Sequence, residues 1–242
     1  TRDEFQAAVR YGYRLFQGNF LSHSEITKGS DIPPNALASL HLLRQAHDPS
    51  PDFDALASII SRDVSLSYRL LRVVNSAAFG LRHKVKSIKH ALVIMGLSEV
   101  RRWIAVLAVT GISGEKSGAL AEAAILRARM AELLAAPVGL AQRASELFLA
   151  GLLSLMDALL DRPMGEVVDL LPLTEDTRTA LLGEAGPFLP VLQLVMAYEK
   201  AQWEQVEALA PTLGIRQAFL PEAYADSLAW ADELGRLETR RA

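Results

Sequence analysis

The spacing of apolar residues is the feature that most limits how this chain can fold. From Asp31 onward, leucine, isoleucine and valine recur every three or four residues, the period of an α-helix with one buried face. Proline, which interrupts helices, divides the second half of the chain into short segments. These prolines are Pro163, Pro172, Pro187, Pro211 and Pro221. An all-α, multi-helix bundle is therefore predicted for residues 31–242.

Local signals predict where individual helices begin and end. Pro33 and Pro34 suit the first turn of a helix that carries Leu37, Leu40 and Leu43. Further predicted boundaries are Asp63 and Ser87 as N-caps, Gly96 as a break before Ser98, and a stop near Pro137 and Gly139. Further predicted buried stripes are Phe53, Leu56 and Ile60, then Trp203 and Val206, and finally Tyr224, Leu228 and Ala231.

The composition excludes several classes of site and partner. Without cysteine, the chain has no disulfide, thiolate metal site or cysteine nucleophile. The formal net charge of −3 argues against general nucleic-acid binding, which needs excess lysine and arginine. No apolar run reaches the roughly 18 residues that cross a bilayer, and the N-terminus lacks the order of a signal peptide. We therefore expect a cytoplasmic chain without a membrane segment.

One helix carries an acid in an otherwise apolar setting. The stretch GLLSLMDALLD, residues 151–161, reads as a single helix that is apolar nearly all round, with Asp157 among its leucines. Asp157 is either a catalytic or metal-binding group, or a satisfied residue that faces solvent or bonds to Ser154, an arginine or a backbone donor. A metal would need further imidazole or carboxylate ligands. The histidines are His23, His41, His47, His83 and His90, so none follows residue 90, and the satisfied residue is favoured.

The stretch LLRVVNSAAFGLRHKVKSIKHALVIMGLSEVRRW, residues 70–103, is the most distinctive in the chain. It resembles the signature of the HDOD family, which are all-helical signalling domains related to the metal-dependent HD phosphohydrolases but lacking their metal ligands. The resemblance implies an HD-like helical bundle that binds other proteins. The residues that carry it are Arg72, Asn75, Ser76, Phe79, Gly80, Ile88, Ala91, Gly96 and Leu97.

The same resemblance locates the lost catalytic position. FLAGLLSLMDALL, residues 148–160, corresponds to the helix on which HD hydrolases carry their adjacent His-Asp pair. The matching dipeptide here is Ser154-Leu155, and a hydroxyl beside a leucine holds no divalent ion. The degenerate position therefore comprises Ser154, Leu155 and the nearby Asp157, and the resemblance implies neither catalysis nor a metal or other cofactor.

The first 30 residues differ in kind from the rest. Phe16 and Phe20 alternate with Gln17 and Asn19, a two-residue period that predicts a strand, and no initiator methionine is present. GYRLFQGNFLS, residues 12–22, is similar to the closing strand of EAL domains, the cyclic di-GMP phosphodiesterases, although Asn19 departs from their usual aromatic residue. We therefore expect residues 1–30 to be the end of an α/β EAL domain plus a linker, and residues 31–242 to be the HDOD domain.

A basic stretch supplies the candidate interaction surface. No acidic residue lies between Val64 and Ser98, and such local asymmetry steers anionic partners. The structural alternative is that the basic residues belong to a solvated loop. In that case Asn75 and Ser76 only end a helix and turn the chain. The aromatic residues of a nucleic-acid groove are few, with only Tyr68 and Phe79 nearby. The candidate residues are Arg72, Asn75, Ser76, Arg82, Lys84, Lys86, Lys89, Arg101 and Arg102, within a stretch that also includes Arg69.

These observations predict a non-catalytic regulatory module in cyclic di-GMP-linked bacterial signalling. Its expected partners are signalling proteins, including an upstream EAL domain, and a second copy of the chain. One alternative is a divergent metal-dependent phosphohydrolase that uses only carboxylates, namely Asp157, Asp161 and Glu146. The other is a nucleotide or nucleic-acid binding module that uses the basic stretch over residues 69–102.

Overall fold

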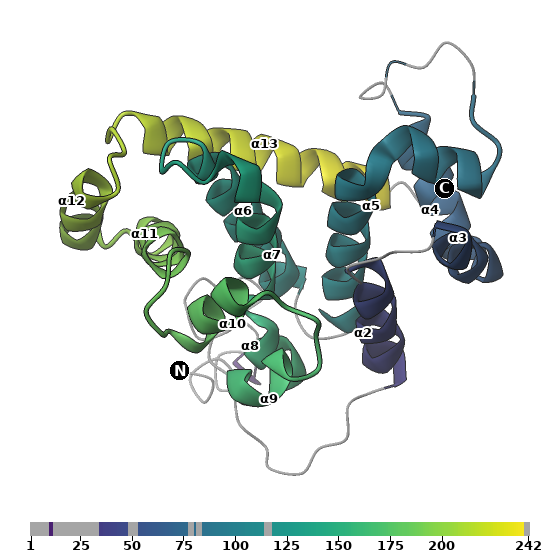
Figure 1. The fold of residues 1–242 in the computed structure, drawn as a ribbon, viewed down its shortest axis with the longest axis horizontal. Coiled ribbons are helices and arrows are strands. Elements are labelled where there is room, and N and C mark those ends of the chain that lie inside the picture. Colours follow the sequence, from purple (N-terminus) through teal and green to yellow (C-terminus); the bar gives the residue numbers. More distant parts are fainter. Residues whose placement is uncertain are drawn as a thin grey trace.

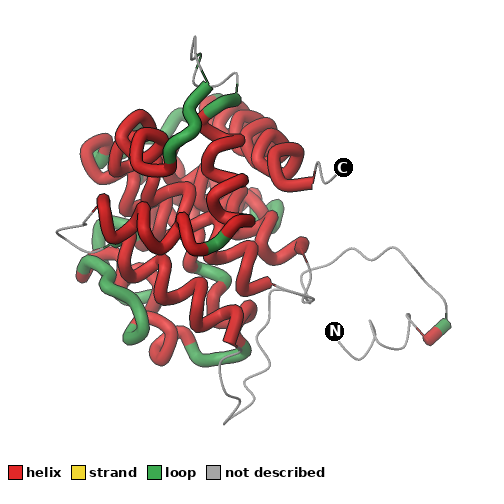
Figure 2. The backbone as a smooth tube through the Cα atoms, turned by 90° about the vertical axis from the view of Figure 1, so that its right-hand side faces the viewer, coloured by secondary structure: helices red, strands yellow, loops and turns green. Residues whose placement is uncertain are grey.

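The computed structural model describes residues 10–11, 34–47, 53–76, 80, 84–113 and 118–239, and every regular element within them is a helix (Figures 1 and 2). The all-α prediction is confirmed for these ranges. The predicted strand and EAL remnant at residues 1–30 lie outside them, apart from Arg10 and Tyr11. The helices are α2 (Pro34–Ala46), α3 (Phe53–Arg62), α4 (Val64–Val74), α5 (Ile88–Ser113), α6 (Gly118–Ala135), η3 (Ala141–Arg143), α7 (Ala144–Leu153), α8 (Met156–Leu160), α9 (Met164–Val168), α10 (Glu175–Leu182), α11 (Leu189–Glu199), α12 (Trp203–Thr212) and α13 (Phe219–Thr239).

Helices α6 and α7 lie at the centre of the bundle, between two outer groups (Figure 1). Helices α2 to α5 form one group, and α10 to α12 lie on the other side. Helix α13 runs across the bundle and contacts α6 and α4 (Figure 1). Its residues Phe219 and Tyr224 also pack against the core cluster that includes α11, so α13 reaches both outer groups. Among the described helices, none combines the length and apolar character that crossing a bilayer requires.

The capping predictions agree with the observed helix ends. The Asp63 carboxylate Oδ1 accepts hydrogen bonds from the backbone N–H groups of Ser65 at 2.8 Å and Leu66 at 3.0 Å, which starts α4. Ser87 precedes α5, and its Oγ accepts a hydrogen bond from the backbone N–H of His90 at 3.4 Å. Gly96 has φ 74° and ψ 162°, a left-handed conformation that breaks α5 at the predicted position.

The prediction of one helix over residues 151–161 was wrong. Helix α7 ends at Leu153 and α8 begins at Met156, so the degenerate dipeptide lies in the turn between them. The Ser154 hydroxyl donates to the Gly151 carbonyl at 2.6 Å, and Leu155 has φ −118°, outside helical geometry. A serine hydroxyl that competes for a helical carbonyl favours such a break.

Three large residues of the predicted stripes do not join the core. Leu37 is 52% exposed, Leu228 is 48% exposed and Trp203 is 54% exposed. In α2 the buried face is formed by Ala36, Leu40 and Leu43 instead. A spacing of four and then three residues follows the 3.6-residue turn, so an alanine takes the inner position that the larger Leu37 was expected to occupy.

The two central helices approach each other closely at Gly151. A Cβ atom placed on this glycine of α7 would lie 2.7 Å from the Ala128 Cα and 2.9 Å from the Arg127 carbonyl oxygen, both in the backbone of α6. Such distances leave no room for a side chain. Gly151 therefore allows the contact that brings Arg127 beside the turn at Ser154.

Candidate functional site

A buried arginine lies beside Ser154, the residue predicted to occupy the degenerate HD position. Arg127 Nη1 donates a hydrogen bond to Ser154 Oγ at 2.8 Å, and Nη2 donates to Glu199 Oε2 at 2.7 Å. Its Nε donates to Glu199 Oε1 at 3.2 Å and to Oε2 at 3.0 Å, so Arg127 contacts both oxygens of the carboxylate. The exposed fractions of the Arg127 and Glu199 side chains are 6% and 14%. A guanidinium and its counter-ion therefore occupy the space beside Ser154.

The other two residues of this position have ordinary structural surroundings. Leu155 is buried in the central core. Asp157 is partly buried, and its Oδ1 accepts a hydrogen bond from the backbone N–H of Ala158 at 2.8 Å. Burial raises the pKa of the Asp157 carboxyl, and the nearby Arg127 charge partly opposes that rise. Asp157 bonds to a backbone donor, one of the satisfied arrangements expected from the sequence.

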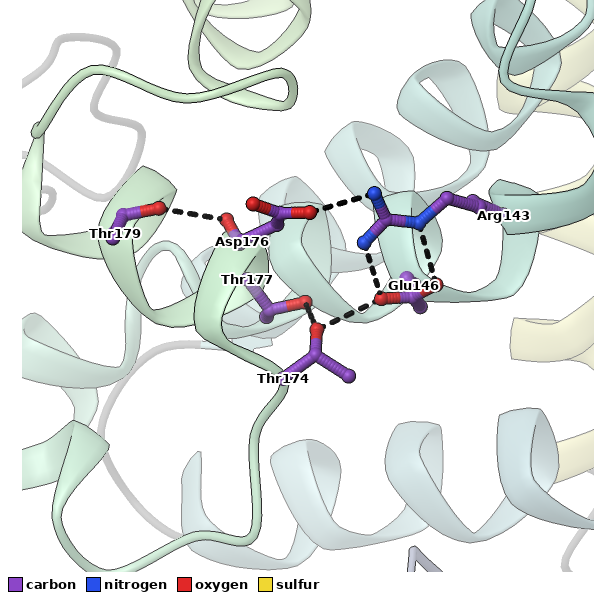
Figure 3. Close-up of polar contacts among 6 residues, drawn as sticks. All are labelled: Arg143, Glu146, Thr174, Asp176, Thr177 and Thr179. Carbon is purple, nitrogen blue, oxygen red and sulfur yellow. Dashed lines mark hydrogen bonds and ion pairs between the residues drawn. The ribbon is translucent and has the colours of Figure 1, made fainter.

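Glu146 belongs to a separate polar cluster at the start of α7 (Figure 3). Arg143 Nε and Nη2 each donate to the Glu146 carboxylate at 2.8 Å, and Nη1 donates to Asp176 Oδ2 at 2.6 Å. Thr174 Oγ1 donates to the same Glu146 carboxylate at 2.8 Å. The hydrogen bonds from Arg143 lower the pKa of Glu146. The Arg143 guanidinium also stacks 4.4 Å from the centre of the Phe188 ring.

The three acids of the carboxylate-only alternative are not gathered around one point. Glu146 is bound to Arg143, whereas Asp157 bonds at the start of α8. Asp161 ends α8 in a left-handed conformation with φ 51°. Across the described ranges, no group of three or more histidine, aspartate or glutamate side chains could hold a metal ion.

Asn75 joins the end of α4 to the segment that precedes α5. Its Nδ2 donates to the carbonyl oxygens of Leu71 at 2.7 Å and Val85 at 2.9 Å, while its Oδ1 accepts from the Val85 N–H at 2.7 Å. The side chain thus replaces backbone pairing between two segments ten residues apart. This is the helix-ending role that the sequence left open for Asn75, and it holds Lys84 and Lys86 in place through Val85.

The basic candidates differ in their exposure and in their partners. Lys84 and Lys86 are exposed on either side of buried Val85. Lys89 forms an exposed ion pair with Asp54 of α3, with 2.5 Å between Nζ and Oδ1. Arg82 lies outside the described residues, Ser76 lies at the end of α4, and Arg72 is partly buried.

Arg101 and Arg102 hold the interior together. Arg101 Nε donates to the Ala46 carbonyl at 2.9 Å, which ties α5 to the end of α2. Arg102 Nη1 donates to Glu99 Oε1 at 2.6 Å, and Nη2 donates to Glu132 of α6. Its guanidinium also lies 5.4 Å from the centre of the Phe148 ring. These contacts make both arginines unsuitable as freely available binding groups.

Sequence reasoning missed the buried charges of α6. Arg127 and Glu132 are each less than a tenth exposed, and their partners come from α11 and α5. The sequence signal for these buried charges was that Arg127 and Glu132 lie within an alanine-rich helix that is apolar on most sides. This pattern indicates that the charges are buried and paired, but it does not identify the residues with which they pair.

His47 follows α2 and lies next to Arg101. Its Nδ1 is 3.1 Å from the Leu43 carbonyl oxygen. Burial lowers the pKa of His47 to about 4, and the charge of Arg101 acts in the same direction. His47 is therefore neutral at physiological pH, with its ring fixed by a backbone carbonyl.

Two curated relatives match nearly the whole chain. The uncharacterized protein YuxH of Bacillus subtilis (strain 168) is 33% identical over 237 residues, covering 97% of this chain and 57% of the relative. The cyclic di-GMP phosphodiesterase CdgJ of Vibrio cholerae serotype O1 is 31% identical over 237 residues, covering 98% of this chain and 55% of the relative. The chain thus spans about half the length of the curated relatives that it matches.

A solved Marinobacter aquaeolei VT8 protein, named for signal transduction, shares 19% identity with a TM-score of 0.47. The match covers 98% of this chain and 64% of that protein. Residues 32–160, from the start of α2 to the end of α8, match the HDOD domain. Helices α9 to α13 lie beyond the matched residues, so the expected boundary at residue 242 stays a prediction. Because this match covers more than half of the chain, the chain belongs to the HDOD family.

Proposed function

We propose that this chain is a non-catalytic regulatory module of cyclic di-GMP-linked signalling, and that it acts by binding other proteins. Membership of the HDOD family supports a signalling role. The name of CdgJ supplies the connection to cyclic di-GMP, although the phosphodiesterase activity is said of that longer protein. The expected partners are an EAL domain, other signalling proteins or a second copy of this chain.

The observation that carries the non-catalytic part is the position of Arg127. Its guanidinium donates directly to Ser154, the residue that aligns with the lost His-Asp pair. A divalent cation placed there would face a fixed positive charge in a poorly solvated interior, where repulsion between like charges is strong. Glu199, the carboxylate that neutralises Arg127, is already bound by two nitrogens of that arginine. The chemistry around Ser154 therefore favours a structural role for this position over metal-assisted hydrolysis.

The segment before α5 supports the binding part of the proposal. Val85 is buried, and both polar groups of its backbone are bonded to Asn75, so the two flanking lysines project from a fixed anchor. Fixed side chains lose less conformational entropy when a partner binds. Lys84 and Lys86 would then contact an acidic protein surface.

A hydrolysis assay tests the non-catalytic part. Purified protein is incubated with Mg²⁺ or Mn²⁺ and either cyclic di-GMP or bis(p-nitrophenyl) phosphate. We expect no turnover above that of the Asp157→Asn and Glu146→Gln variants, which remove carboxylates from the alternative ligand set. Turnover by the unchanged protein that disappears in either variant would establish the carboxylate-only phosphohydrolase instead.

Site-specific photo-cross-linking in cells that contain the complete parent protein tests the binding part. A photoreactive residue at position 84 or 86 is expected to give a discrete protein adduct, whereas one at Glu207 on α12 gives none. With the probe at position 86, Lys84→Glu should reduce the adduct. Equal yields at position 207, or an unchanged yield with Lys84→Glu, would contradict the proposed surface.

Charge reversal at Lys84 and Lys86 also distinguishes a protein partner from a nucleic-acid partner. Of the basic candidates, Lys89, Arg101 and Arg102 already have acidic or carbonyl partners, so few cations are left to contact phosphates. Nucleic-acid affinity that falls steeply with salt, and is lost with Lys84→Glu and Lys86→Glu, would favour the nucleic-acid alternative.

A further inference from the structure

A pocket of about 370 Å³ lies between α13, the end of α4 and the middle of α5. Its walls are mainly apolar and include Val73, Met95 and Trp103 on one side and Trp230 on the other. The crossing of α13 over the bundle is visible in Figure 1. A volume of a few hundred cubic ångströms is within the range of pockets that hold small molecules.

Two tryptophans give this pocket rigid aromatic walls. Trp103 is 7% exposed and belongs to the core of the α2–α5 group. Trp230 meets Phe148 edge to face, with ring centres 5.8 Å apart and planes at 89°. The Arg129 guanidinium lies 5.6 Å from the centre of the Trp230 ring, and Arg129 Nη1 donates to Glu132 at 2.5 Å. Trp230 already holds one cation, and its orientation is fixed by neighbours on two sides.

The charges around the pocket leave negative charge at its rim. Arg102 lies in the wall, but its guanidinium is shared between Glu99 and Glu132. Glu99 is about half exposed, and Glu233 is exposed at the same pocket. Among the side chains that the structure describes, none forms an ion pair with Glu233. Among the described side chains in and behind this wall, three carboxylates face two guanidiniums: Glu99, Glu132 and Glu233 against Arg102 and Arg129.

We propose that this pocket binds a small organic cation. Its weakly hydrated cationic head would lie between Trp103 and Trp230, and Glu99 and Glu233 at the rim would balance its charge. Aromatic faces attract quaternary ammonium and similar weakly hydrated cations, and partial burial strengthens that attraction. Neither an anion nor a phosphate suits this rim. The site is distinct from the segment around Lys84 and Lys86, so the inference goes beyond the proposed function.

The three tryptophans of the chain allow a test with an internal control. Indole N–H signals of ¹⁵N-labelled protein are assigned with Trp→Phe variants and followed during titration with choline. The signals of Trp103 and Trp230 should shift and saturate, while that of Trp203, on α12, stays in place. The neutral analogue 3,3-dimethyl-1-butanol has the same shape, and it should bind at least about threefold more weakly because it lacks the cation.

Rim variants decide whether charge contributes. Glu233→Gln should weaken choline binding about two- to fivefold, the range expected for an exposed charge. Glu222→Gln, on the same helix but outside the pocket lining, should leave it unchanged. Absence of a saturable shift, equal binding of the neutral alcohol, or an equal effect of both variants would each overturn the proposal. None of these outcomes affects the cross-linking result.

Discussion

Replacing Arg127 by methionine is expected to destabilise the protein far more than replacing an exposed arginine. The substitution keeps most of the side-chain volume but removes the guanidinium that binds Glu199 and Ser154. The Glu199 carboxylate, 14% exposed, then lacks its counter-ion. Breaking a buried ion pair by removing one partner costs about 3–5 kcal/mol.

The double variant Arg127→Met with Glu199→Met makes the prediction sharper. Replacing both members of a buried pair by apolar groups is often close to neutral, because no charge is left without a partner. We therefore expect the double variant to be more stable than Arg127→Met alone. Ser154→Ala removes one hydrogen bond to a charged donor and should cost about 1.5 kcal/mol.

Urea unfolding followed by far-ultraviolet circular dichroism measures these free energies. The matched control is Arg162→Met, which removes an i,i+4 ion pair with Glu166 at 3.2 Å whose side chains are 26% and 57% exposed. Such a pair contributes about 0–1 kcal/mol. If Arg127→Met and Arg162→Met have equal effects, or if the double variant loses the sum of its single losses, the buried-pair reasoning is refuted.

Three further predictions concern packing, pH and the loop before α5. Gly151→Ala would place a Cβ 2.7 Å from the Ala128 Cα, and forcing α6 and α7 apart should cost about 2–3 kcal/mol and lower the melting temperature. The pKa of His47 falls from 6.5 to about 4 on folding, so the unfolded state binds more protons between these values. The contribution of neutral His47 to the free energy of unfolding is therefore fully present above pH 6.5 and is lost as the pH falls. Urea titrations should show a decrease of about 1–2 kcal/mol at pH 5. Asn75→Ala removes the bonds to Val85 and should cost about 1–3 kcal/mol, with faster hydrogen exchange at the Val85 amide.

Each of these predictions has a matched control. Gly165→Ala in α9 should be harmless, because its Cβ would meet no atom within 4 Å. His47→Gln should flatten the pH dependence, whereas His90→Gln, at an exposed position, should not. Ser76→Ala is the control for Asn75→Ala. The packing prediction is contradicted if the two glycine substitutions have equal effects. The pH prediction is contradicted if His47→Gln leaves the pH slope unchanged, and the loop prediction if the Val85 amide stays protected in Asn75→Ala.

The sequence predicted the parts of the fold that local chemistry determines. Asp63 caps α4 because its carboxylate reaches backbone donors two and three residues away. Gly96 breaks α5 because glycine adopts positive φ at little cost. Leu37 was placed wrongly because small residues such as Ala36 also fill buried positions, and apolar spacing alone does not rank them.

The candidate site was less predictable because its key contacts join distant segments. Arg127 and Glu199 are 72 residues apart, and no local pattern pairs them. Ser154 was singled out through resemblance, which gave no sign of its guanidinium partner. The basic stretch was read as one surface, whereas Arg101 and Arg102 have partners in other helices. Such pairings depend on how helices pack, which the residue spacing within one helix does not encode.

The contact between α13 and α4 has a consequence for how the protein is made. The ribosome synthesises α4 long before Trp230, so the apolar surface beneath α13 stays uncovered until the segment that contains Trp230 has emerged. Contacts between such distant segments form late, because the chain must first close a long loop. A nascent chain halted before α13 would therefore be prone to aggregation and would attract chaperones.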